Sequence, residues 1–158
     1  MGRDSTRFTR RWSPRIKNEA YTKKVNNDTP SFFVPELSDE EFDRLISKAM
    51  DELPQQYIRG LDNVVIVYAD EPDEHQRAKS NLGEHSLLLG LYEGIPLTKR
   101  GAGYTFVLPD KITLFKYPIL AVVRNEAELY EQIKRTLWHE IAHYYGLDHD
   151  RIHELERG

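Results

Sequence analysis

The 158-residue sequence contains no cysteine. Disulfide bonds, zinc sites built from cysteine and a catalytic thiol are therefore excluded. No apolar run approaches the roughly 18–20 residues that a membrane-spanning helix needs, and the first residues lack the apolar stretch of a secretory signal. From these absences we expect a cytoplasmic protein without a membrane partner.

Charges of both signs are present but are unevenly distributed along the chain. Charged residues make up 30% of the sequence and hydrophobic residues 39%, which is typical of a domain with a packed core. Residues 1–30 hold eight Lys and Arg against three Asp and Glu, whereas the rest of the chain holds 14 against 23. We therefore predict a basic, flexible N-terminal extension over 1–35 and one folded domain over 36–158. A contact between this extension and nucleic acid is the alternative interpretation.

Helical and strand periodicity occur in turn along the domain. Ser38 followed by Glu41 is a capping-box pattern, and the apolar spacing behind it predicts a helix over 39–53. A longer helix is expected from Asn125, a good N-cap. Strands are predicted at 63–68, 87–92, 104–108 and 111–115, and a short charged helix at 150–157.

The long helix ends in the spacing His139-Glu140-x-x-His143-x-x-Gly146-x-x-His149. Residues four apart lie on one face of a helix, so His139 and His143 can direct two imidazoles at one ion. Glycine reaches the left-handed conformation that ends helices, so the chain can turn at Gly146 and bring in His149. Three protein ligands with a fourth position open for water are typical of catalytic zinc. We therefore predict one zinc ion (Zn2+) bound by His139, His143 and His149.

Glu140 indicates what chemistry this site performs. It follows His139 directly, so its side chain leaves the helix about 100° away and can flank the ion without binding it. A carboxylate there can take a proton from metal-bound water, whose pKa falls to about 7 on zinc, and pass it to a leaving amine. We therefore predict that Glu140 is the general base of a metallopeptidase, a hydrolase of peptide bonds.

Other polar side chains are weaker candidates. His75 and His85 lie in a polar stretch without periodicity, and His153 lies in the C-terminal helix. Isolated histidines of this kind are usually solvated. Four side chains are candidate partners for an oxyanion, and their spacing does not choose among them: Tyr92, Arg100, Tyr144 and Tyr145.

With these residues identified, the chain resembles the minimal zincin-like metallopeptidases, a family of small bacterial zinc enzymes. The resemblance covers about residues 38–157 and does not include the basic extension. It rests on the capped first helix, on the segments 90–98 and 108–115, and on residues 136–143.

The resemblance implies a zincin-like α+β fold in which a long active-site helix and an N-terminal helix pack against a small mixed sheet. It implies zinc on His139 and His143, Glu140 as general base, and a peptide or protein substrate. Many members carry Asp at the offset of the third ligand. Here that offset is His149, and Asp150 is retained as the alternative ligand. An extended peptide would pair with an edge strand of the sheet, for which the second predicted strand is the candidate.

Two other functions fit parts of the pattern. Bacterial rRNA-maturation endonucleases use a similar helix, H-x-x-x-H-x-x-G-x-D-H, which Asp148 and His149 match. Those enzymes carry a small residue where Glu140 lies here. A non-catalytic module that keeps zinc for stability or for binding a partner is the other alternative. The sequence specifies neither the peptide substrate nor the oligomeric state.

Overall fold

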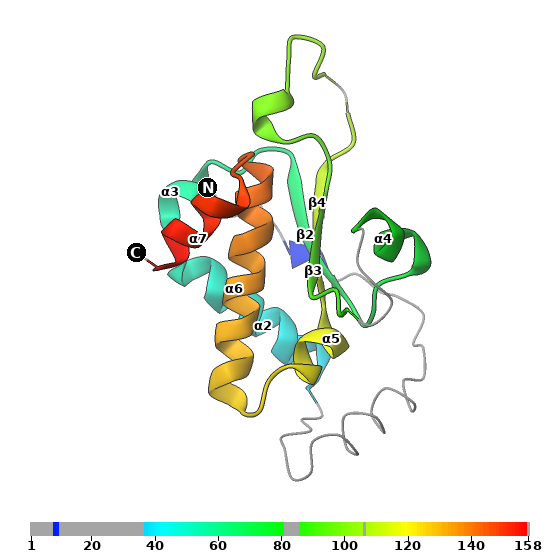
Figure 1. The fold of residues 1–158 in the computed structure, drawn as a ribbon, viewed down its shortest axis with the longest axis vertical. Coiled ribbons are helices and arrows are strands. Elements are labelled where there is room, and N and C mark those ends of the chain that lie inside the picture. The colour runs from blue at the N-terminus through cyan, green and yellow to red at the C-terminus, as the bar shows by residue number, and fades with distance from the viewer. Residues whose placement is uncertain (1–7, 10–36, 81–85, 106, 158) are drawn as a thin grey trace.

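The computed structural model describes residues 8–9, 37–80, 86–105 and 107–157. A β-sheet separates the helices into two groups, with α2, α3, α6 and α7 on one side and α4 on the other (Figure 1). The α+β class predicted from the sequence is confirmed. In chain order the elements are β1 (Phe8–Thr9), α2 (Asp39–Glu52), α3 (Gln55–Arg59), β2 (Val64–Ala69), α4 (Glu74–Lys79), β3 (Gly90–Glu93), η2 (Leu97–Lys99), β4 (Asp110–Phe115), α5 (Lys116–Ala121), α6 (Glu126–Tyr144) and α7 (His149–Arg157).

The sheet is mixed, with strand order β1-β2-β4-β3. β2 pairs with β4 in parallel, and β3 pairs with β4 antiparallel, with Tyr92 opposite Ile112. Within the described residues β3 is therefore an edge strand. β1 places Phe8 and Thr9 beside β2 in parallel, although both belong to the predicted extension. The rest of that extension lies outside the described residues, and the division of the chain at residue 35 stays a prediction.

Helix α2 begins and ends almost where its sequence pattern predicts. The Ser38 hydroxyl accepts a hydrogen bond from the Glu41 N–H at 3.1 Å, which satisfies one of the unpaired donors of the first turn. The apolar stripe is buried on the rest of the core through Phe42, Ile46, Ala49 and Met50. The predicted helix over 39–53 is confirmed, with its last residue at Glu52.

Helix α6 is the longest element and carries the residues of interest at its C-terminal end. The Asn125 side chain caps it by accepting the Glu128 N–H at 2.9 Å, as predicted. Its core stripe is completely or almost completely buried against α2 and the sheet, and each such side chain contributes about 1.5–3 kcal/mol of burial free energy. This packing places α6 in contact with β3. The stripe consists of Leu129, Ile133, Leu137 and Ile141.

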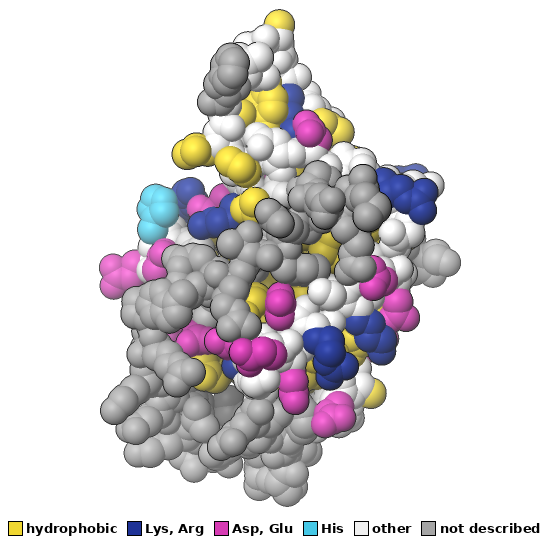
Figure 2. Space-filling model, turned by 180° about the vertical axis from the view of Figure 1, so that it is seen from behind, with side chains coloured by type: hydrophobic (Ala, Val, Ile, Leu, Met, Phe, Trp, Pro, Cys, Tyr) yellow, Lys and Arg dark blue, Asp and Glu magenta, His cyan; other side chains and the backbone are white. Residues whose placement is uncertain are grey.

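The predicted strand over 104–108 is wrong for the residues that are described. Tyr104, Thr105 and Val107 have no ladder partner and lie in a segment that projects between β3 and β4. Tyr104 instead accepts a hydrogen bond from the Asn63 side chain at 2.9 Å. Hydrophobic side chains gather on this projection in Figure 2, and Leu108 is 88% exposed. Apolar residues alone do not make a strand when no neighbouring strand supplies hydrogen bonds.

Short helices also occupy stretches without a clear helical pattern. Helix α4 lies in the polar segment 70–85, of which 81–85 is not described, and it begins with a capping box between Asp73 and Gln76. Helix α5 takes up the apolar piece around Pro118, which is tolerated in a first turn because its missing N–H needs no partner there. None of the helices formed by the described residues is both long and apolar enough to cross a bilayer.

Candidate metal centre

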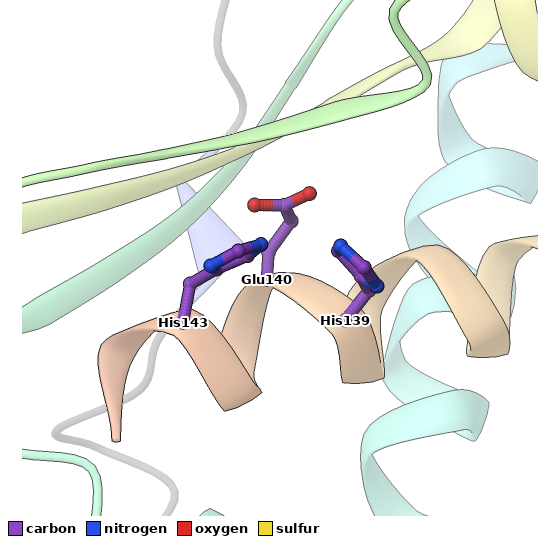
Figure 3. Close-up of side chains that lie close together, drawn as sticks. All are labelled: His139, Glu140 and His143. Carbon is purple, nitrogen blue, oxygen red and sulfur yellow. The ribbon is translucent and has the colours of Figure 1, made fainter. Parts of the chain in front are cut away.

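His139, Glu140 and His143 converge on one side of α6, as Figure 3 shows. The two imidazole rings lie edge to face with their centroids 4.7 Å apart. One ligand atom from each of the three residues lies within 4.8 Å of the other two. The predicted spacing on one helical turn has therefore brought these side chains together.

The chemistry of this donor set fits a zinc ion. Both histidines are half-buried, so they remain accessible while being partly shielded from bulk water. Imidazole nitrogen suits zinc, copper, iron and nickel, and an adjacent carboxylate adds the negative charge that a divalent cation favours. The three residues therefore form a group that could hold a metal ion.

The Glu140 carboxyl is buried, with 8% of the residue exposed. Burial raises its pKa from the ordinary value of 4.5 to about 7, and a hydrogen bond from the Tyr92 backbone N–H partly opposes that rise. A carboxyl whose pKa lies near neutrality can both accept and return a proton at physiological pH. The carboxyl points from α6 toward the sheet (Figure 3).

Strand β3 lies directly on α6 at this point because residue 90 is glycine. A Cβ atom added to Gly90 would lie 2.7 Å from Cγ2 of Thr136 and 3.3 Å from Cγ of Glu140. A larger residue would therefore push the strand away from the helix. Glycine within a strand often marks close backbone approach, and this is the signal in the sequence that points to the contact.

The turn after α6 has the predicted conformation. Gly146 has φ +76°, and its N–H donates to the His143 carbonyl at 2.9 Å. The Leu147 N–H donates to the Ala142 carbonyl at 3.0 Å, which completes the helix-ending pattern that requires a left-handed residue. A Cβ atom at Gly146 would lie 2.5 Å from Oγ1 of Thr98, so η2 packs against this turn.

The structure does not assign the third ligand. His149 is the first residue of α7, and its side chain lies outside the described part of the chain. Asp150 is exposed and does not belong to the described group that could share an ion. Asp148 accepts the Arg151 N–H at 2.8 Å, so its carboxylate is used at the start of α7.

The other histidines lie apart from the pair. His75 is exposed on α4, on the opposite side of the sheet from α6, and His153 is exposed on α7. Neither belongs to the described group around His139. His85 lies outside the described residues. The interpretation of His75 and His153 as surface residues agrees with these positions.

The hydroxyls of two of the predicted oxyanion candidates form hydrogen bonds with backbone groups. The Tyr144 hydroxyl is buried and accepts the Asp62 N–H at 3.0 Å. The Tyr145 hydroxyl donates to the Tyr57 carbonyl at 2.6 Å, and burial raises the pKa of Tyr145 to about 12. Both hydroxyls therefore hold α6 to the segment around α3.

The other two candidates meet at a residue that the sequence alone does not single out. The Tyr92 hydroxyl donates to the Asp110 carboxylate. Arg100 pairs with the same carboxylate at 2.7 Å. Asp110 is 2% exposed, yet in the sequence it looks like an ordinary residue of a Pro-Asp turn. These three side chains form a buried polar network next to the metal centre.

Comparison with known protein families agrees with this geometry. A family model described as zincin-like metallopeptidase matches residues 61–158. The match includes β2, the edge strand β3, β4 and the whole of α6, and it begins after α2 and α3. No curated protein gives a match to the chain. Because the matched region covers more than half of the sequence and contains the convergent His139, Glu140 and His143, the chain belongs to the zincin-like metallopeptidase family.

Proposed function

We propose that this protein is a zinc-dependent peptidase in which His139, His143 and His149 bind the ion and Glu140 is the general base. The observation that carries the proposal is a buried carboxyl beside two imidazoles that share one helical turn. Structural histidine pairs do not need such a carboxyl, whereas hydrolysis of an amide needs a group that moves a proton.

Glu140 performs the proton transfers of the proposed reaction. Zinc held at the pair would supply Lewis-acid chemistry, polarising a peptide carbonyl and lowering the pKa of water. In its carboxylate form Glu140 takes a proton from the attacking water as the new bond to the carbonyl carbon forms. It then gives that proton to the nitrogen as the carbon–nitrogen bond breaks. The burial of the Glu140 carboxyl and a hydrogen bond from the Tyr92 backbone N–H support this role.

An extended peptide is the substrate that the sheet can accept. β3 is an edge strand among the described strands, and it carries the backbone that approaches Glu140. Addition of a peptide strand to such an edge uses backbone hydrogen bonds for affinity and alternating side chains for selectivity. The predicted edge strand over 87–92 corresponds to β3, which spans Gly90–Glu93.

His149 is the proposed third ligand because the turn at Gly146 redirects the chain just before it. Asp150 remains the alternative. Zinc content measured on His149→Ala and Asp150→Ala separates them. Loss of zinc from the first variant alone supports His149, and loss from the second alone assigns the role to Asp150.

Glu140→Gln tests the function directly. The variant should retain zinc and lose hydrolysis of casein and of a peptide library, because glutamine cannot take a proton from water. Glu131→Gln is the matched control, since Glu131 is exposed on the same helix. Hydrolysis by Glu140→Gln at the wild-type rate would exclude Glu140 as the base. RNA cleavage by a zinc-loaded wild type that leaves peptides intact would favour the endonuclease alternative.

A further inference from the structure

The Glu140 carboxyl is held by the strand above it as well as by its own helix. Tyr92 directs its backbone N–H at the carboxyl, and Gly90 lets the strand approach the Glu140 stem closely. The place of the proposed base therefore depends on where β3 lies. Among the described strands β3 lies at the edge of the sheet, so there it is hydrogen-bonded to β4 on one side.

Asp110 accepts hydrogen bonds from the end of β3 and from the turn that follows it. The Tyr92 hydroxyl donates to its Oδ2 atom, and the Ile95 N–H donates to its Oδ1 atom at 3.3 Å. The turn between those two residues closes over the carboxylate. Gly94 has φ +154°, and a Cβ atom there would lie 2.6 Å from Cβ of Asp110. The buried Asp110 carboxylate thus contacts both the end of β3 and the turn that follows it.

Arg100 completes the network from the projecting segment. Its Nη2 atom lies 2.7 Å from Oδ2 of Asp110, and its other guanidinium nitrogens donate to the carbonyls of Ile95 and Asp62, each at 3.0 Å. The side chains of Arg100 and Asp110 are only 7% and 3% exposed. Buried ion pairs of this kind add little net stability, but they can specify one arrangement of the chain.

The Arg100 guanidinium also contacts helix α6. It lies 4.9 Å from the ring centroid of Tyr144, the residue that directly follows His143. The Tyr92 ring also meets the Tyr144 ring edge to face, with centroids 6.3 Å apart. The network therefore contacts both β3 and the helix turn that presents the second imidazole.

We propose that Asp110 and Arg100 are positioning residues for peptide hydrolysis, acting through Tyr92 to hold β3 over Glu140. The proposal rests on Glu140 being the general base. Neither residue contacts the reacting atoms. Their contribution is to keep the base aligned with the water that it deprotonates, so their loss should lower kcat.

Tyr92→Phe is the least disruptive test, because it removes one hydroxyl and keeps the ring and the backbone N–H. It should lower kcat about tenfold, the size expected when a hydrogen bond to a charged group is lost, with zinc content unchanged. Tyr130→Phe is the matched control. Its hydroxyl also donates to a carboxylate, that of Glu52, at a place on α6 outside the metal centre. The control should keep the wild-type kcat.

A second measurement does not depend on activity. Amide hydrogen exchange followed by NMR in the zinc-loaded protein reports how firmly the residue-92 N–H is held. In Tyr92→Phe this exchange should accelerate about tenfold relative to the residue-112 amide on the adjacent strand β4. Tyr130→Phe should leave that ratio unchanged.

The two measurements separate the positioning role from the proposed function. Local acceleration at residue 92 without peptidase activity in the wild type would support the anchoring of β3 while refuting the peptidase assignment and, with it, a role for Asp110 and Arg100 in hydrolysis. Unchanged exchange at residue 92, uniform acceleration through the core, or an unchanged kcat in an active enzyme would each overturn the proposal.

Discussion

Glu140→Gln should make the metal-free protein more stable, even though it removes the proposed base. Burial raises the pKa of Glu140 from 4.5 to about 7. Since a tenfold change in proton affinity corresponds to about 1.4 kcal/mol, the buried charged form costs about 3 kcal/mol of folding free energy. Glutamine avoids that cost because it carries no charge, and its side-chain oxygen can still accept the Tyr92 N–H.

The sign of the effect depends on pH in a defined way. Below pH 4.5 both the folded and unfolded states are protonated, so the stabilising contribution of the neutral carboxyl is fully present. Between pH 4.5 and about 7 the unfolded chain loses this proton while the folded protein keeps it, so the stabilising contribution decreases. It is gone once the pH exceeds the pKa of the folded state. The stability difference between Glu140→Gln and wild type should therefore grow by about 3 kcal/mol between about pH 4 and pH 8.

Urea unfolding of chelator-treated protein across this pH range measures the difference. Glu131→Gln, on the exposed face of the same helix, is the matched control for the loss of one carboxyl. Titrating groups far from residue 140 are shared by variant and wild type, so their contributions cancel. A Glu140→Gln difference that is constant with pH would refute the buried, proton-retaining carboxyl.

Three further substitutions test the framework of the site by the same unfolding titration. Gly146→Ala should cost about 2 kcal/mol, because φ is +76° and the added methyl meets η2, whereas Gly101→Ala, with no atom within 4 Å, should be near neutral. Ile133→Ala should cost about 2–5 kcal/mol, since this side chain is completely buried, and a loss below about 1 kcal/mol would contradict that packing. Arg100→Met should cost about 3–5 kcal/mol by leaving the Asp110 carboxylate buried without its cation, and a neutral result would mean that the pair is solvated.

The features that could be predicted from the sequence are those whose causes lie within one or two helical turns. Ser38 and Asn125 cap the helices that follow them, and Gly146 adopts the left-handed conformation expected of it. His139 and His143 converge because a helix places residues four apart on one face. Each outcome depends on local geometry, so periodicity and capping rules were sufficient.

The features that could not be predicted depend on pairings between distant parts of the chain. The approach of Gly90 to Glu140 spans fifty residues, and it appears only once β3 has paired with β4. The role of Asp110 depends on Arg100 folding back from a projecting segment. That segment, around Tyr104, has strand-like composition but finds no partner strand, which is why the predicted strand there was wrong. Tertiary contacts decided each of these cases.

Zinc bound per chain, measured by mass spectrometry of metals in purified protein, tests the central claim most directly. Wild type and Glu140→Gln should each carry about one zinc ion, as should His153→Ala, whose imidazole is exposed on α7. His139→Ala and His143→Ala should each lose the zinc ion, because each substitution removes one of the two proposed ligands on this helical turn. Zinc retained at the wild-type level by either of these two variants, or absent from the wild type after incubation with zinc, would contradict the metal centre.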